Sequence, residues 1–279
     1  MEKIVIAVNA VNPSRNALEM GCFLARLTRS RVKVLFLENE VVEEHMVLKQ
    51  EQGMHYVDWE VDKTSTQYQA RARLIEENLR QVRGAACNRE VSLDLRRAPG
   101  VPAREVAGES RYADLVVVDP ETSFHKSAEL PPTEFVREVL AHAECPVLLS
   151  CGDMEGIDEI VFTYEDSASS VFAIRQFAYL FPQLRDRPVT VLHINEGGRE
   201  LAAEREQLAE WLSNHFTSNR FREITGKADE ELINFLLGRN KVLVVLGAYG
   251  RGVLSNLVRQ SHANQLIRSL LQPLFIAHT

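Results

Sequence analysis

Short apolar runs rich in β-branched residues alternate along the chain with longer segments whose apolar positions recur every three or four residues. The runs are typical of buried strands, and the longer segments are typical of amphipathic helices. We therefore expect five strands alternating with four helices in each half of the chain. The expected strands lie at residues 3–9, 32–38, 91–95, 113–119 and 144–150, and again at 159–163, 189–195, 221–225, 241–247 and 272–278.

The second half of the chain repeats the order of the first. Residues 3–25 and 159–180 each contain an apolar run, a polar turn with serine near a helix start, and a segment with helical spacing. A crossover helix returns the chain to the same end of a sheet, so this alternation indicates parallel strands. The repeat predicts an α/β fold with two tandem, doubly wound, parallel five-stranded sheets, in domains 1–152 and 157–279.

One segment, Asn39–Ser65, has no counterpart in the second half and is mixed in character. We expect an inserted loop with some helix there. Polar amphipathic helices are expected at about 67–86 and 199–216. The polar, glycine-containing stretch Cys151–Asp158 marks the join between the two domains.

Composition narrows the class of protein. A chain of 279 residues suits two domains, and 45% hydrophobic with 25% charged residues is ordinary for a soluble protein. The formal net charge of -7 argues against nucleic-acid binding, which favours a basic surface. No apolar run approaches the ~20 residues of a membrane span, and the opening segment with Glu2 is unlike a signal peptide. We expect a cytoplasmic protein that binds neither nucleic acid nor membrane.

The cysteines and histidines do not form a recognisable reactive or metal-binding motif. No CxxC pair occurs, so free thiols are expected, with Cys145 and Cys151 as small buried residues. His142 and Cys145 have a ligand-like spacing but lack a second pair, so no metal site is indicated. The chain also lacks GxxxxGK[ST], HExxH and GxSxG, so no catalytic residue is assigned and we do not expect an enzyme. The four cysteines are Cys22, Cys87, Cys145 and Cys151.

A candidate anion-binding loop, GAYGRGVLSNLVRQS at 247–261, follows the apolar run at 241–247 and precedes an expected helix. Glycine leaves backbone N–H groups open to an anion, and a helix start adds a partial positive charge. Gly247 and Gly250 supply that access, and Ser261 adds a hydroxyl donor at the helix start. Two alternatives stay open: the loop still binds an anion, or it is the remnant of a loop that once bound one.

The charges around this loop are all positive. Residues 232–279 contain no Asp or Glu. Such a cluster attracts anions, although solvated surface charges would give the same pattern. The positive residues are Arg239, Lys241, Arg251, Arg259 and Arg268.

This layout and this loop together resemble the universal stress protein family, of adenine nucleotide alpha hydrolase-like fold, in its tandem two-domain form. The resemblance covers nearly the whole chain outside the insertion. The family pattern is Gly, two residues, Gly, nine residues, then Gly and Ser or Thr. Gly247, Gly250 and Ser261 match this pattern, and Gln260 replaces the third glycine. The resemblance implies the strand order 3-2-1-4-5 in each domain and a protein that is not generally a turnover enzyme.

The resemblance also implies a ligand for the second domain. Family members that bind ATP lay its phosphates along the loop and its adenosine near the first two strand ends, with an Asp after the first strand. Glu165 stands at the position of that Asp, with Asp166 beside it, and His193 and Ile194 lie where they would flank an adenine. Two carboxylates near a polyphosphate call for a divalent cation. The implied ligand is ATP or AMP with Mg2+, or another anion.

The first domain departs further from the family pattern. Aligned from Pro146 and Pro273, its loop positions hold Pro120, Ser123, Thr133 and Glu134, and Asn9 replaces the family's Asp. Proline has no N–H to offer, and a glutamate repels an anion. We therefore expect a degenerate nucleotide site there. Within the surface loop, His125 and Lys126 are a weak indication of an anion site.

Two functions from different classes remain. One is a regulatory, stress-response protein whose second domain binds an adenine nucleotide or another anion. The alternative is a protein-protein interaction module, with unknown protein partners, in which both sites are degenerate. Because single-domain relatives dimerise through their last strands, we expect the Pro-led strands at 146–150 and 273–278 to pair within the chain as a pseudo-dimer. Whether two chains also form a homodimer stays open.

Overall fold

The computed structural model describes residues 1–39, 44–51, 54–61, 63–85, 91–125, 127–152, 156–197, 202–247 and 272–277. The elements of the first half are β1 (Lys3–Asn9), α1 (Arg15–Thr28), β2 (Arg31–Asn39), β3 (Glu44–Glu51), β4 (Met54–Val61), α2 (Thr66–Ala85), β5 (Leu93–Gly100), α3 (Pro102–Ser110), β6 (Leu115–Val118), α4 (Glu134–His142) and β7 (Val147–Leu149). Those of the second half are β8 (Glu159–Thr163), α5 (Ala168–Leu180), η2 (Pro182–Leu184), β9 (Val189–Asn195), α6 (Ala202–Ser213), β10 (Asn219–Thr225), α7 (Ala228–Leu236), β11 (Val242–Gly247) and β12 (Leu274–Ala277).

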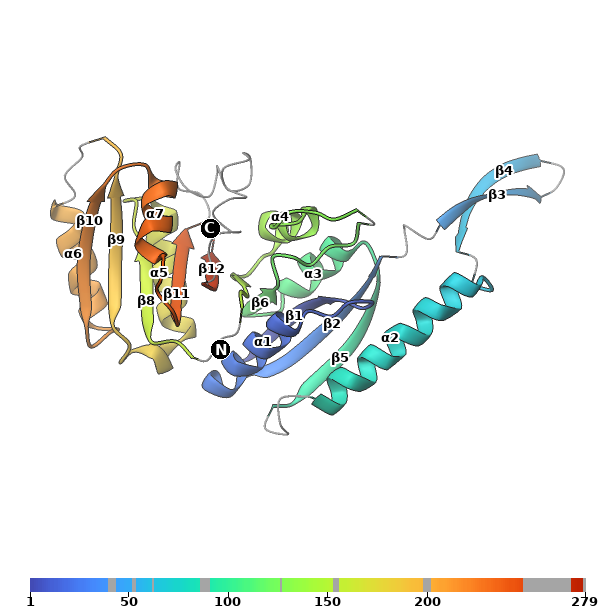
Figure 1. Ribbon diagram of the computed structural model, residues 1–279, viewed down its shortest axis with the longest axis horizontal. Helices are drawn as coiled ribbons and strands as arrows, with labels where there is room; N and C mark the ends of the chain where they lie inside the picture. The colour runs from blue at the N-terminus through green and yellow to red at the C-terminus, as the bar shows by residue number, and fades with distance from the viewer. Residues whose placement is uncertain are drawn as a thin grey trace.

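All strands except β3 and β4 form one ten-stranded sheet in the order β10-β9-β8-β11-β12-β7-β6-β1-β2-β5 (Figure 1). Pairing is parallel within each half, where the order in chain numbering is 3-2-1-4-5. The predicted fold class and strand order are confirmed. The two five-stranded sheets are continuous with each other, so the whole sheet is mixed. The helix expected between 247 and 272 lies outside the described residues.

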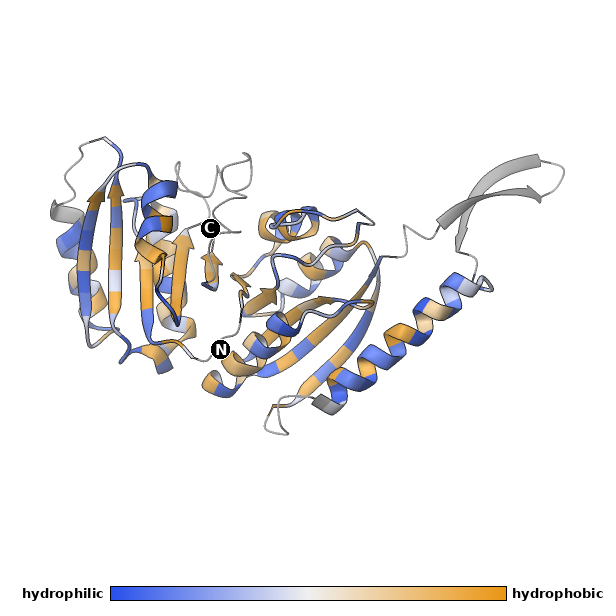
Figure 2. Ribbon diagram, viewed as in Figure 1, coloured by the Kyte–Doolittle hydropathy of each residue, from blue (hydrophilic) through white to orange (hydrophobic). Residues whose placement is uncertain are grey.

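Helices cover both faces of the sheet, as the doubly wound prediction requires. One hydrophobic cluster joins the strands to α1, α2, α5 and α6, and a second joins them to α3, α4 and α7. Figure 2 shows the hydrophobic residues concentrated along the strands. Strands buried on both faces need near-continuous apolar sequence rather than alternation, which explains the apolar runs of the sequence.

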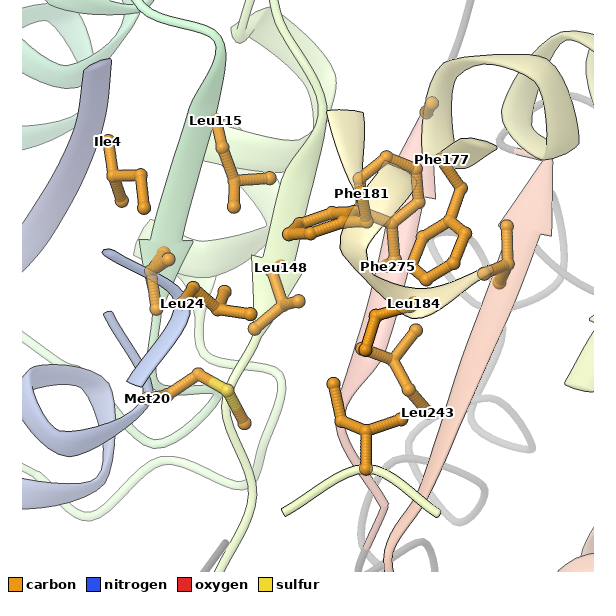
Figure 3. Close-up of a cluster of buried hydrophobic side chains, with 14 of the residues drawn as sticks. Ile4, Met20, Leu24, Leu115, Leu148, Phe177, Phe181, Leu184, Leu243 and Phe275 are labelled. Carbon is orange, nitrogen blue, oxygen red and sulfur yellow. The ribbon is translucent and has the colours of Figure 1, made fainter. Parts of the chain in front are cut away.

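The two halves meet where β7 pairs with β12 in antiparallel register, Leu148 opposite Phe275. Phe275 is fully buried, and its ring centroid lies 5.3 Å from that of Phe177 and 6.1 Å from that of Phe181. Figure 3 shows Leu148 from the first half beside Phe181 and Phe275 from the second. The predicted pairing of the two Pro-led strands is therefore confirmed, and it covers two sheet edges that would otherwise be exposed.

Serine begins the first helix of each half, as the polar turns of the sequence indicate. The Ser14 side chain accepts a hydrogen bond from the backbone of Ala17 at the start of α1. Ser167 does the same for α5, where it forms a capping box with Ser170. A side-chain acceptor at this position satisfies a backbone N–H that the helix leaves unpaired. Each cap fixes where the helix starts after the first strand of its half.

The insertion differs from the prediction. In place of a loop with some helix, it contains an antiparallel hairpin of β3 and β4, a separate two-stranded sheet that extends away from the ten-stranded one (Figure 1). The register places Met46 opposite Trp59 and Leu48 opposite Val57. These apolar residues occupy alternate positions of each strand, which is the period of a strand rather than of a helix.

The cysteines also differ from the prediction in part. Cys22, buried in α1, is disulfide-bonded, so the expectation of free thiols is wrong for this residue. Disulfide formation depends on spatial proximity, which cysteine spacing in the sequence does not reveal. Cys145 and Cys151 are free, as predicted, but both are half-buried rather than fully buried. Burial and nearby carboxylates, Asp114 for Cys145 and Asp119 for Cys151, raise the pKa of each thiol to about 12 and make it unreactive.

Within the described part of the chain, no helix has the length and apolar character needed to cross a membrane.

Candidate functional site

The described part of the candidate site lies at the carboxyl ends of β8, β9 and β11. These strands are parallel neighbours, so their carboxyl ends share one edge of the sheet. Glu165 and Asp166 follow β8, His193 lies near the end of β9, and Gly247 is the last residue of β11. Of the predicted site residues, Gly250, Gln260 and Ser261 lie outside the described residues.

Asp166 sits in a tight turn before α5. Its φ of 53° is in the left-handed region, which Asp tolerates better than most side chains. The Tyr164 hydroxyl donates to Asp166 Oδ1 over 3.2 Å. The turn thereby holds a carboxylate directly before Ser167, the N-cap of α5. An acidic group at a helix start is stabilised by the partial positive charge of that end.

His193 is oriented by the backbone of the same turn. Its Nδ1 lies 2.9 Å from the carbonyl oxygen of Tyr164. A carbonyl oxygen only accepts, so Nδ1 carries the proton, and Nε2 is the accepting nitrogen of the neutral ring. The side chain is half-buried. The ring therefore has a fixed tautomer and a fixed plane at the end of β9.

Gly247 lies against the backbone of the first turn of α5. A Cβ built at this position would come within 2.6 Å of Ser169 C and Ser170 N. No real side chain tolerates such distances to a backbone. Glycine at 247 is therefore required by the packing of β11 on α5, independently of any ligand. The same close approach brings the end of β11 to the positive end of a helix.

Polar groups farther along β9 bind other parts of the protein. The Asn195 side chain accepts from the Gly197 N–H over 3.1 Å and donates to Glu223 over 3.0 Å. Glu196 accepts from the backbone N–H of Ala228 over 2.6 Å, at the start of α7. These hydrogen bonds engage the polar side chains at the carboxyl ends of β9 and β10 with other parts of the protein.

The first half has a different arrangement at the equivalent edge. The strand registers pair Ile4 with Leu115 and Ile160 with Leu243, which places Asp119, and not Pro120, at the position of Gly247. The sequence alignment from the prolines was wrong by one residue here, because the first half has one extra residue between its last two strands.

Side chains of the first half close this edge themselves. The buried Asp119 carboxylate accepts from the Ser14 hydroxyl and from the Glu121 N–H. Asn9 donates from Nδ2 to the Ser123 carbonyl oxygen over 2.7 Å and accepts from the Val11 N–H over 2.9 Å. A carboxylate thus occupies the start of α1, and the loop after β6 is tied to the end of β1. The Asp119 carboxylate therefore places a negative charge beside the N-cap residue of α1.

The anion site suggested by His125 and Lys126 is not supported. His125 Nε2 lies 3.0 Å from Glu134 Oε2, so the ring faces a carboxylate. Lys126 lies outside the described residues. The sequence missed this pairing because the two residues come from a loop and from the following helix, and only the fold brings them together.

Comparison with known proteins identifies the fold. No family model matches the chain, and no curated protein matches it in sequence. A universal stress protein from Archaeoglobus fulgidus DSM 4304 superposes with a TM-score of 0.69 and 16% identity, covering 99% of this chain and 96% of that one. The predicted resemblance is confirmed at the level of fold. The chain has the architecture of a tandem universal stress protein.

Two structures from Pseudomonas aeruginosa are similar in the same way. One, from strain UCBPP-PA14, is assigned as a universal stress protein, and the other, from strain PAO1, is described as functionally unknown. Each has a TM-score of 0.56 and 12% identity and covers 100% of this chain, with 93% and 92% of its own length matched. At such identities the likeness concerns the fold, and the ligand must be argued from the residues of this chain.

Proposed function

We propose that the chain is a regulatory, stress-response protein whose second half binds an adenine nucleotide or another anion at the carboxyl edge between β8 and β11. The observation that carries the proposal is the strand order. From β8 the chain order runs to β9 and β10 on one side, whereas β11 and β12 lie on the other side, so the strand order reverses between β8 and β11. Ligands of open α/β sheets bind in the crevice at such a switch point. The candidate loop 247–261 begins there.

The residues of the second half have complementary roles in this proposal. Phosphate oxygens accept hydrogen bonds from the backbone amides of Gly247 and Gly250 and from the Ser261 hydroxyl. The Gln260 side chain leaves the phosphate less room than the family glycine would. His193, fixed by its bond to Tyr164, lies beside the base. Glu165 and Asp166 bind a nucleotide through Mg2+ rather than directly, because carboxylates repel phosphate. The positive charges of residues 232–279 favour the anion further.

The first half contributes structure in this proposal and does not bind nucleotide. Asp119 places a negative charge at the position of Gly247 and accepts from the N-cap residue of α1. Asn9 is already bonded to the loop after β6. We propose no catalytic residue in either half and no turnover.

A second candidate function is a protein-protein interaction module without nucleotide. The observation in its favour is that the close packing of β11 on α5 already requires glycine at position 247. The presence of Gly247 alone therefore does not indicate a ligand. Gln260 at the position of the third family glycine points the same way. The two candidates make opposite predictions for nucleotide binding.

The test is the melting temperature of the full chain with and without millimolar ATP or AMP, each with Mg2+ or with a chelator. A ligand at 100 times its dissociation constant stabilises the folded state by about 2.7 kcal/mol, which raises the melting temperature by several degrees. We expect a rise with at least one nucleotide and its loss in Gly250→Val. The matched control is Gly108→Val in α3, where a Cβ meets nothing within 4 Å. No rise with any adenine nucleotide would favour the interaction module.

A further inference from the structure

The loop between β6 and α4 of the first half gathers three side chains that can bind a metal ion. His125, Glu129 and Glu134 each offer a ligand atom, and these atoms all lie within 4.8 Å of one another. His125 and Glu129 belong to the loop, and Glu134 is the first residue of α4. Among the residues that the structure describes, this is the one such group of three.

The distances within the group suit a single ion. His125 Nε2 and Glu134 Oε2 are 3.0 Å apart, the distance of two groups that share a proton or flank a cation. Both side chains are about half exposed, at 53% and 54%, so an ion can enter and keep water in its remaining positions. Catalytic and exchangeable metal sites commonly combine three protein ligands with water.

Glu129 is the least exposed of the three ligands and is held in place by two hydrogen bonds. One carboxylate oxygen accepts from the Ser123 hydroxyl, and the other accepts from the backbone N–H of Glu134 over 3.2 Å. A carboxylate oxygen that accepts one hydrogen bond retains a lone pair for a metal ion. Hydrogen bonds of this kind orient a ligand before the ion arrives and strengthen metal sites.

The rest of the loop is anchored on both sides of the group. The Ser123 carbonyl oxygen accepts from Asn9, the His125 N–H donates to the Ser123 hydroxyl over 3.1 Å, and Thr133 caps α4. The Phe124 ring packs edge-on against Phe135 of α4, with centroids 4.9 Å apart. The ligands are therefore arranged by the folded protein and do not need an ion to bring them together.

We propose that His125, Glu129 and Glu134 form a binding site for a divalent transition-metal ion such as Zn2+, completed by water. An imidazole with two carboxylates suits Zn2+, Mn2+, Co2+ or Ni2+, whereas Mg2+ and Ca2+ prefer oxygen ligands alone. Two carboxylates neutralise the divalent charge and outweigh the partial positive charge of about +0.5 at the start of α4. Any proton on the imidazole leaves to solvent when the ion binds.

This site is independent of the nucleotide proposed for the second half. The two proposals concern opposite charges at the equivalent edges of the two halves, a cation in the first and an anion in the second. Nucleotide binding can therefore fail while metal binding succeeds, and the reverse also holds.

The experiment is calorimetric titration of the metal-free full chain with Zn2+ alone, repeated with Co2+, whose absorption spectrum reports nitrogen and oxygen ligands. We expect one ion per wild-type chain. His125→Ala and Glu134→Gln each weaken binding by more than about tenfold. Both side chains are exposed, so the variants should melt at the wild-type temperature when metal is absent.

The control is His142→Ala, which removes another exposed histidine, at the end of α4, three residues from the free thiol of Cys145. This variant should bind Zn2+ as the wild type does. Two results would overturn the proposal: no Zn2+ binding to the wild-type chain, or Zn2+ binding that His125→Ala and Glu134→Gln leave unchanged.

Discussion

One position distinguishes the two carboxyl edges of the sheet. Gly247 and Asp119 are equivalent by strand register, and each lies where a strand approaches the first helix of its half. In the second half the helix backbone is too close for any side chain, and in the first half the Asp119 side chain bonds to the cap of α1. The same fold position thus carries no side chain in one half and a negatively charged side chain in the other.

The packing role of Gly247 can be measured directly. Gly247→Ala places a methyl group 2.6 Å from the backbone of α5, and relieving such overlap costs about 1–3 kcal/mol of unfolding free energy. Urea unfolding of this variant and of Gly108→Ala, whose added methyl meets nothing within 4 Å, provides the comparison. Gly108→Ala should be neutral or slightly stabilising, because alanine favours a helix interior. Equal stability of the two variants would mean that β11 and α5 are farther apart than described.

Partly buried carboxylates at the opposite, amino edge of the sheet make stability depend on pH. Burial raises the pKa of Glu109, but hydrogen bonds and charges from Lys3 and Lys33 lower it more, so the net pKa is below its usual 4.5. The pKa of Glu159 in the second half is also lowered, because Thr190, Arg220 and Arg239 outweigh its burial. A lowered folded pKa stabilises the protein above the unfolded pKa, and this contribution is lost as pH falls through the folded pKa.

We therefore expect the unfolding free energy to decrease as pH falls below 4.5, and Glu109→Gln to flatten part of that decrease. Urea unfolding midpoints between neutral and acidic pH measure both effects. Glu144→Gln is the control, since its ion pair with Arg111 is half exposed and contributes little. If Glu109→Gln has the same pH profile as the wild type, the ion pairs of Glu109 with Lys3, Lys33 and Arg96 do not contribute to the pH dependence of stability.

At the scale of elements, the described strands and helices outside the insertion follow from the sequence because their signals are local. The apolar runs give the strands, and the serine caps give the starts of α1 and α5. The β3–β4 hairpin was not predicted, although apolar residues occupy alternate positions in its strands. Polar and apolar residues are mixed along the insertion, and this mixture indicated neither the period of a strand nor that of a helix. The disulfide of Cys22 and the group around His125 were missed because they depend on which segments meet in the fold.

The junction between β7 and β12 is the element-scale feature with the clearest energetic consequence. Phe275→Ala empties a fully buried position between two other rings, and such changes cost about 3–5 kcal/mol. The matched control is Tyr179→Ala on α5, an aromatic side chain that is 51% exposed and should cost far less. Chemical denaturation gives both values. Similar losses in the two variants would contradict the burial of the junction.

At the scale of the whole molecule, the chain joins two similar halves through their last strands into one sheet with a shared hydrophobic cluster. The repeat and the two apolar, proline-led last strands can be read from the sequence, whereas the strand order and the pairing of the halves were expected from the resemblance to the universal stress protein family. The sequence did not show which residue of the first half is equivalent to Gly247. The strand register shows that it is Asp119, one residue before the position given by the alignment of the prolines.

The most direct test is the number of nucleotides bound per chain, measured by isothermal titration with Mg-ATP and with AMP. We predict one per wild-type chain and none in Gly250→Val, because the proposed site uses the glycine-led loop of the second half, whereas Asp119 and Asn9 of the first half are already bonded to other parts of the protein. Two nucleotides per chain, or none in the wild type with either ligand, would contradict a single site in the second half.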